Sequence, residues 1–196
     1  MKKVLLAIAV LSISASLYAG SFIGVSVAPD WYFDSKGSGC TDILFTADGA
    51  NYFGLDHSFG IEYGIGVVFP INMWEGERTE SLVGSPYGFV FRTGLGYRYD
   101  TAGLIGIFLG AGVHGTLQMF NDEPSADQDL RVFSLDIYCR AGIDFNIMDI
   151  LSINAGLLAG VPVYTSATVL PGGGSFDGYS RKGFFIAPFA GISLMY

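Results

Sequence analysis

The sequence predicts an all-β fold, an eight-stranded antiparallel β-barrel that spans a membrane. Apolar side chains recur at every second position over segments of about 12 to 17 residues, longer than the roughly five or six of a soluble strand and long enough to cross a bilayer. Charged residues are only 14% of the 196 residues, against about 25% in an average soluble domain. There are 28 glycines, a small residue that suits the crowded interior of a narrow barrel.

The first residues predict a secretory signal peptide, residues 1–19. Lys2 and Lys3 precede an apolar run over 4–11, and Ala19 precedes Gly20. This is the charged, apolar and small-residue order of a cleavable signal, and the apolar run is shorter than the roughly 20 residues of a transmembrane helix. We expect cleavage after Ala19, which leaves 20–196 as one barrel domain and changes the formal charge from −8 to −10 by loss of two lysines.

Eight strands follow in order. They are expected at 21–33, 41–54, 58–70, 86–99, 104–119, 131–147, 151–164 and 183–196. Alternation is clearest in 131–147, where apolar odd positions such as Phe133 and Ile137 alternate with polar even positions such as Asp136. It is least regular in 41–54, where Asp42, Asp48 and Gly49 interrupt it.

The connections alternate in length. Short links are expected near 55–57, 100–103 and 148–150, and longer polar or glycine-rich links near 34–40, 71–85, 120–130 and 165–182. Short turns on one side of the membrane and long loops on the other are typical of outer-membrane barrels. With both chain ends on the side of the short turns, the number of strands must be even.

Aromatic residues gather near the predicted strand ends, which predicts two girdles at the membrane interfaces. The loop side would hold Trp31, Tyr32, Phe69, Trp74, Tyr87, Phe120, Phe133, Tyr164 and Phe184, and the other side Phe53, Phe59, Tyr97, Tyr99, Phe145 and Tyr196.

One stretch allows a rival fold. Residues 101–120 carry no formal charge and could form a transmembrane helix, with Gly106 and Gly110 as a GxxxG pair. From 105 to 119 the apolar residues fall on one strand face, broken only by Gly115, and the polar residues and other glycines fall on the opposite face, which favours a strand. Residues 110–115 also match GxGxxG, but phosphate binding requires that motif at a strand-to-helix turn.

The end of the chain carries a resemblance. Tyr196 is the last residue, and Ala190, Ile192 and Leu194 precede it at alternate positions. This resembles the C-terminal insertion signal of outer-membrane proteins that the barrel assembly machinery reads, with Tyr in place of the commoner Phe. The mature chain resembles the small eight-stranded barrels of the OmpA transmembrane-domain, OmpX and OmpW type. The resemblance implies the outer membrane of a diderm bacterium, with its lipids and the assembly machinery as partners.

The less apolar strand face predicts a charged lumen. It carries Glu62, Arg92, Arg98, Asp136, Arg140 and Asp144. Buried charges must pair, so three acids and three bases predict a balanced salt-bridge network that closes the barrel. A selective pore would show rings of one sign. The inward glycines leave space, which Phe108 and Tyr138 are expected to fill.

No catalytic motif is present. Some eight-stranded barrels modify lipid A with a Ser/His/acid set at one membrane edge. His114, Ser134 and Asp136 have the required chemistry, but the expected register does not bring them together. We therefore expect a structural histidine, no catalytic residues and no cofactor.

The remaining candidate groups have ordinary explanations. Asp122, Glu123, Asp127 and Asp129 could ligate Ca²⁺, but their spacing matches no EF-hand, so a solvated acidic loop and no metal site are expected. The pI of about 4.5 excludes a basic nucleic-acid binder. Cys40 and Cys139 are expected to be free thiols, because the alternation places Cys139 on the outward face.

The sequence thus predicts a non-enzymatic outer-membrane barrel with a structural or surface-interaction role. The extracellular loops would meet a ligand that the sequence does not identify. The alternative is a narrow channel or carrier for small molecules, including hydrophobic ones, as the OmpW resemblance implies.

Overall fold

The computed structural model describes residues 21–34, 37–53, 58–75, 78–81, 87–101, 104–121, 129–148, 150–170, 174–175 and 183–195. Eight long strands build the wall: β1 Ser21–Asp34, β2 Ser38–Phe53, β3 Phe59–Glu75, β5 Tyr87–Thr101, β6 Ile105–Asn121, β7 Asp129–Met148, β8 Leu151–Leu170 and β10 Gly183–Met195. Two short strands, β4 Arg78–Ser81 and β9 Gly174–Ser175, pair with β3 and β8. No helix among the described residues is long and apolar enough to cross a membrane.

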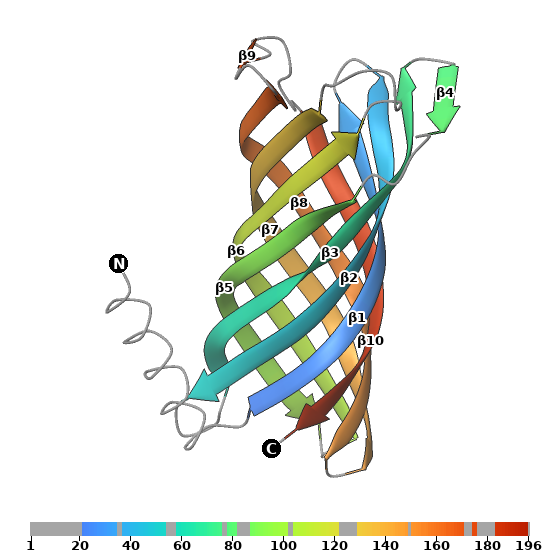
Figure 1. Cartoon of the computed structure of the whole chain (residues 1–196). Helices are drawn as coiled ribbons and strands as arrows, with labels where there is room; N and C mark the ends of the chain where they lie inside the picture. Colours follow the sequence, from blue (N-terminus) through green and yellow to red (C-terminus); the bar gives the residue numbers. More distant parts are fainter. Residues whose placement is uncertain are drawn as a thin grey trace.

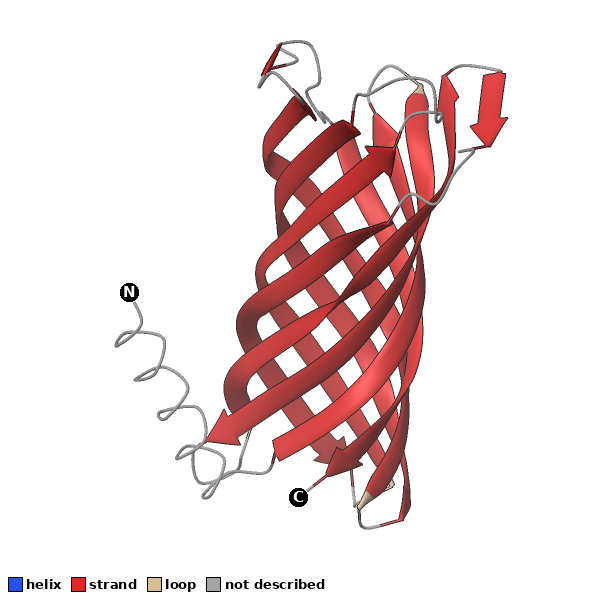
Figure 2. Ribbon diagram, viewed as in Figure 1, coloured by secondary structure: helices blue, strands red, loops and turns tan. Residues whose placement is uncertain are grey.

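The sheet closes on itself. Each long strand pairs antiparallel with the next, and β10 pairs with both β8 and β1, through Leu194↔Leu151 and Phe22↔Met195 for example. Figures 1 and 2 show the resulting barrel, whose strands are tilted relative to its long axis. We call the end that holds Ser21 and Met195 the terminal end, and the end that holds β4 and β9 the loop end. The predicted eight-stranded barrel is confirmed.

The strand map needs three corrections. In β2 the aspartates at 42 and 48 do not interrupt the alternation, because the even positions of this strand face inward and both side chains are buried. β3 and β8 continue to Glu75 and Leu170, beyond the expected ends at 70 and 164. The connection expected to be long at 34–40 is short, since β1 and β2 pair as far as Phe33↔Gly39. Gly37 there has φ of 82° and its N–H donates to the Asp34 carbonyl at 3.1 Å.

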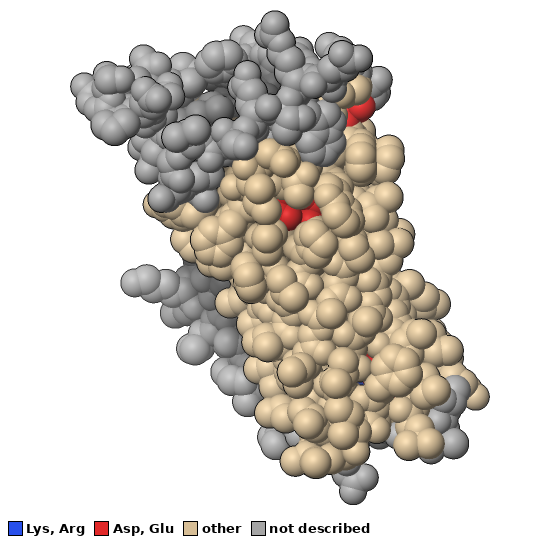
Figure 3. Space-filling view, turned by 90° about the vertical axis from the view of Figure 1, so that its right-hand side faces the viewer, with Lys and Arg blue, Asp and Glu red and all other residues tan. Residues whose placement is uncertain are grey.

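The outer wall is apolar. Odd-numbered positions of β7 such as Ile137 and Ile143 are exposed, and the face in Figure 3 shows few Asp, Glu, Lys or Arg atoms. Aromatic pairs lie near both ends: Phe33–Phe184 (ring centroids 5.3 Å) at the loop end and Phe59–Tyr97 (4.9 Å) at the terminal end. One girdle assignment is wrong, because Tyr32 is buried and faces the interior.

Rings occupy the space that the inward glycines leave. A Cβ on Gly156 would lie 2.7 Å from Phe189 Cζ, and one on Gly160 would lie 2.7 Å from Phe185 Cζ. A Cβ on Gly142 would likewise collide with the Phe108 ring, and a Cβ on Gly94 would lie 2.8 Å from the Tyr138 hydroxyl oxygen. The stretch that could have been a helix forms strand β6. The expected filling by Phe108 and Tyr138 is therefore seen, and both side chains are buried.

Neither cysteine forms a disulfide, and the two thiols lie on opposite faces of the wall, Cys40 buried inside and Cys139 exposed outside. We expect a small apolar maleimide to label the folded barrel at Cys139 alone, because Cys40 reaches reagent only when the wall opens. Mass spectrometry of labelled peptides before and after urea unfolding measures this. Equal labelling of both cysteines in the folded state would contradict the assigned faces, and Cys139→Ser is the control that should abolish folded-state labelling.

Candidate functional site in the barrel interior

The six charged residues expected in the lumen all face the interior. Glu62, Arg92, Arg98, Asp136, Arg140 and Asp144 are each less than a tenth exposed. They come from β3, β5 and β7, at positions of the same parity as the inward glycines of those strands. Buried ions need partners, because the cost of removing each from water amounts to several kcal/mol.

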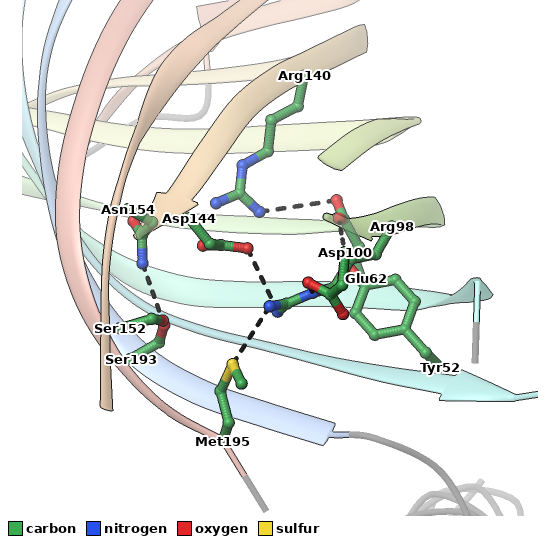
Figure 4. A network of polar contacts seen from close by, with 10 residues as sticks. All are labelled: Tyr52, Glu62, Arg98, Asp100, Arg140, Asp144, Ser152, Asn154, Ser193 and Met195. Carbon is green, nitrogen blue, oxygen red and sulfur yellow. Dashed lines mark hydrogen bonds and ion pairs between the residues drawn. The ribbon is translucent and has the colours of Figure 1, made fainter. Parts of the chain in front are cut away.

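A polar network fills the terminal end of the interior (Figure 4). Arg98 is its centre: Nη1 lies 3.3 Å from Asp144 Oδ2, and Nε donates to Asp100 Oδ1 at 3.0 Å. Arg98 Nη2 also donates to Met195 Sδ at 3.2 Å, which ties the last described residue of β10 to β5. Beside them, Ser152 and Ser193 share a hydrogen bond of 2.7 Å. The Arg98–Asp144 and Arg98–Met195 contacts join strands that are not neighbours in the sheet.

The next pair along the interior joins β3 to β7. Arg140 Nη1 lies 3.7 Å from Glu62 Oε2, and the Tyr52 hydroxyl donates to Glu62 Oε1 at 3.3 Å. The Arg140 guanidinium also lies over two rings, with Cζ 4.6 Å from the Phe108 centroid and 4.4 Å from the Phe189 centroid. Cation–π contacts of this kind compensate part of the lost hydration of a buried guanidinium.

Glycine makes the space for these ion pairs. A Cβ on Gly96 or Gly110 would collide with Glu62, and a Cβ on Gly64 would lie 2.6 Å from Asp48 Oδ1 and 3.1 Å from Arg92 Nε. The inward glycines therefore accommodate charged side chains as well as rings, and they do not leave an open path at these positions.

Asp48 is a member of the network that sequence reasoning missed. Its Oδ1 lies 2.6 Å from Arg92 Nη2, and its Oδ2 accepts from Ser26 Oγ at 2.5 Å and from Thr46 Oγ1 at 3.1 Å. The residue was read as a break in the pattern of β2. Counting inward along β2 from Tyr52 by twos would have placed it in the lumen.

The interior is acidic, which corrects the expected balance of three acids and three bases. Asp30, Asp42 and Asp48 are also buried and inward-facing, so the described interior holds six carboxylates and three guanidiniums. Asp30 and Asp42 are direct partners in the β1–β2 register near the loop end. Asp42 Oδ2 accepts a hydrogen bond from Gln118 Nε2 at 2.6 Å.

The structure brings together His114, Ser134 and Asp136, contrary to the sequence-based expectation. His114 and Asp136 are direct partners between β6 and β7, with Nδ1 3.2 Å from Oδ2. Ser134 Oγ donates to Asp136 Oδ1 at 2.6 Å. In a nucleophilic triad the serine bonds to the histidine and the acid orients the histidine; here the carboxylate lies between the other two. All three side chains are buried, which suits a structural cross-link.

The other sequence-predicted sites lie at the edges of the described structure. Ala190, Ile192 and Leu194 are exposed on the outer face of β10, and Tyr196 lies outside the described residues. Asp122, Glu123 and Asp127 also lie outside them, as does the expected signal peptide 1–19; Asp129 begins β7. Within the part of the chain that the structure describes, no three His, Cys, Asp or Glu side chains are grouped to hold a metal ion.

Comparison with known proteins identifies the fold. No family model and no curated protein matches the sequence. Among solved structures, the barrel is similar to neisserial surface protein A (TM-score 0.61, 12% identity, covering 90% of this chain and 97% of that one). It is also similar to the outer-membrane protein OprG of Pseudomonas aeruginosa (0.58, 16%, 91% and 97%) and to Ail, the attachment invasion locus protein of Yersinia pestis (0.55, 10%, 91% and 99%). The resemblance to small eight-stranded outer-membrane barrels is thus confirmed for the fold.

Proposed function

We propose that this chain is a non-enzymatic outer-membrane barrel with a closed lumen, which serves as a rigid support for its extracellular connections. Three features support the proposal: the apolar outer wall, the aromatic pairs near both ends and the likeness to solved outer-membrane proteins. Rigid scaffolds that carry variable loops are a common arrangement for binding. The loop end faces the outside of the cell in this proposal, since outer-membrane barrels have their longer connections there.

The filled interior is the observation that carries the proposal. Ion pairs occur at successive levels, Arg98–Asp144, Arg140–Glu62 and Arg92–Asp48. An apolar cluster occupies further interior positions and consists of Ala28, Tyr32, Cys40, Leu44, Val68, Phe108, Tyr138, Leu158, Phe185, Ala187 and Phe189. A barrel of eight strands has an interior only wide enough for side chains, and here these side chains interlock.

Biogenesis follows from the same proposal. The barrel assembly machinery would read the outward row Ala190, Ile192 and Leu194 together with Tyr196, after the signal peptide 1–19 has directed secretion. The partners of the folded protein would be outer-membrane lipids around the wall and an extracellular ligand of the loops.

Single-channel recording tests the closed lumen. We expect the mature chain 20–196, refolded into a planar bilayer, to give no steady current. The double variant Glu62→Ser/Arg140→Ser should conduct, because it removes the Arg140–Glu62 pair and leaves no buried charge without a partner at this level. A shift in SDS gel mobility between unboiled and boiled samples verifies that each protein is folded. Reproducible current steps from the unmodified protein would contradict the proposal.

A carrier for small apolar molecules is the second candidate. The apolar interior of β2, β3 and β5 near the loop end supports it, because apolar side chains can hold an apolar molecule. Val68, Val90 and Leu44 are buried interior side chains of the adjacent strands. In this alternative, a small apolar molecule would enter from the loop end and lie among these side chains.

An uptake assay distinguishes the two candidates. An apolar environment-sensitive dye would be added to vesicles that contain the barrel, and its entry rate compared with that of empty vesicles. The carrier requires a faster entry that falls when Ala187→Trp fills the apolar cluster. Entry equal to that of empty vesicles, from protein with heat-dependent gel mobility, leaves the closed scaffold as the function.

A further inference from the structure

The outer wall carries a single exposed basic side chain among those that the structure describes. Arg131 lies at the loop end of β7 and is exposed, whereas Arg92, Arg98 and Arg140 are buried in the interior. Its neighbours in sequence show which face it occupies: Val132 and Ser134 are buried inside, and Ile137 and Cys139 are exposed outside. Arg131 therefore projects from the surface that faces lipid.

The surroundings of Arg131 combine rings and hydroxyl groups. Thr168 of β8 is its register partner, and Ser166 is the partner of Phe133, the next outward-facing residue of β7. The Phe133 ring lies 6.2 Å from the Tyr164 ring. We call Arg131, Phe133, Tyr164, Ser166 and Thr168 the Arg131 patch. It places one cation and two hydroxyls directly beyond an aromatic pair.

The height of the patch on the wall points to the headgroup region. The aromatic pairs Phe33–Phe184 and Tyr87–Phe89 lie at the same end of the barrel, and amphipathic rings mark the membrane interface. No ion pair joins Arg131 to a described residue. A guanidinium at this level, above apolar wall, is suited to a phosphate, which it can bind through two parallel N–H donors.

We propose that the Arg131 patch binds a phosphate of an outer-leaflet phosphoglycolipid. The guanidinium would hold the phosphate, the hydroxyls of Ser166 and Thr168 would meet sugar hydroxyls, and the acyl chains would lie along Phe133, Leu135 and Ile137. This inference rests on the proposed function, because it requires the loop end to face the outer leaflet. The paired hydroxyls favour a glycolipid over a phospholipid with a small headgroup.

Lipid retention tests the site. The mature chain 20–196 would be refolded in phosphatidylcholine nanodiscs that contain bisphosphorylated lipid A, extracted into mild detergent, and examined by native mass spectrometry for bound lipid. We expect lipid A to remain bound to the unmodified barrel and to decrease at least about tenfold in Arg131→Ala, the loss of one charge-assisted contact. Arg131→Lys should retain an intermediate amount, because ammonium cannot bind the phosphate through a planar fork.

Two controls isolate the phosphate and the position. Lipid A without its phosphates should bind the unmodified barrel no better than it binds Arg131→Ala. The variant Arg131→Ala/Met148→Arg places a new cation at the exposed Met148 of the terminal end and should not restore retention. Asp129→Asn, two residues before Arg131 in β7, should retain at least as much lipid, since it removes a neighbouring negative charge.

Each outcome has a defined meaning. Equal retention by the unmodified barrel and Arg131→Ala would overturn the site and leave the outer-membrane proposal intact, provided that both proteins show heat-dependent gel mobility. Equal retention of phosphatidylglycerol and lipid A would overturn the glycolipid assignment, because phosphate alone would then suffice. A chain that forms no heat-modifiable barrel in lipid would overturn the proposed function and this inference together.

Discussion

Replacing Arg92 by methionine should lower the free energy of unfolding by about 3–5 kcal/mol, the cost of leaving a buried ion without its partner. Arg92 is 6% exposed, and its Nη2 lies 2.6 Å from Asp48 Oδ1. Ser26 and Thr46 donate to the other carboxylate oxygen, so the aspartate would keep hydrogen bonds but lose its cation. Methionine fills most of the arginine volume, which separates the loss of charge from the loss of packing.

Urea unfolding in detergent micelles, followed by tryptophan fluorescence and gel mobility, measures this effect. The double variant Arg92→Met/Asp48→Asn should recover a large part of the loss, because it leaves no uncompensated charge. Arg131→Met is the matched control on the outer surface and should change stability by no more than about 0.5 kcal/mol. A double variant as unstable as Arg92→Met alone would show that the Arg92–Asp48 pair is not the source of the effect.

The alternation of apolar residues is sufficient to predict the barrel, because it depends only on whether each residue faces outward or toward the interior. The same rule explains the missed acids. Asp42 and Asp48 occupy even-numbered positions of β2, as the buried Tyr52 does, and these positions face the interior. An acidic residue in a membrane strand looks like a break in the apolar pattern unless its position along the strand is counted. Strict counting along the strand would have revealed an interior with more acids than bases.

Register could not be predicted in the same way. Whether His114 meets Asp136 depends on the geometry of the connection between β6 and β7, and a shift of two residues would keep every side chain on its face. The register of β7 with β8 also changes at a bulge between Leu135 and Asp136. Alternation therefore predicts which residues face the interior, whereas the pairs that they form depend on turns that have no comparable signal.

The strand ends beyond the wall were missed for a related reason. In β8 the expected end at 164 lies where apolar alternation fades, and the strand continues with polar residues such as Thr165 and Ser166. In β3 the apolar alternation itself continues past 70, with Ile71 and Met73. A strand that has left the lipid no longer needs an apolar outer face. Only hydrogen bonding to β2, β4, β7 and β9 maintains it there, and sequence periodicity does not report such pairing.

Replacing Tyr138 by alanine should destabilise the barrel by about 3–5 kcal/mol, the usual cost of truncating a large buried ring. Tyr138 is 1% exposed. Its register partners in β6 and β8 are Gly112 and Gly160, and Gly112 pairs in turn with Gly94. Glycines have no side chain that could move into the cavity, so the site cannot collapse and the cost should lie toward the upper end. Urea unfolding of the refolded variant measures it.

Tyr138→Phe separates the ring from its hydroxyl. That hydroxyl is buried and has no hydrogen-bond partner among the described residues, so its removal should change stability by less than about 1 kcal/mol, since no bond is lost and a desolvated polar group disappears. A large loss in Tyr138→Phe would mean that the hydroxyl is bound through water to the neighbouring charges. If Tyr138→Ala also conducts in a planar bilayer while Tyr138→Phe stays silent, the ring itself closes the interior between glycine-lined strands. The high glycine content then has a physical reason, because a large side chain such as Tyr138 can close a barrel this narrow where the neighbouring strands present positions without a side chain.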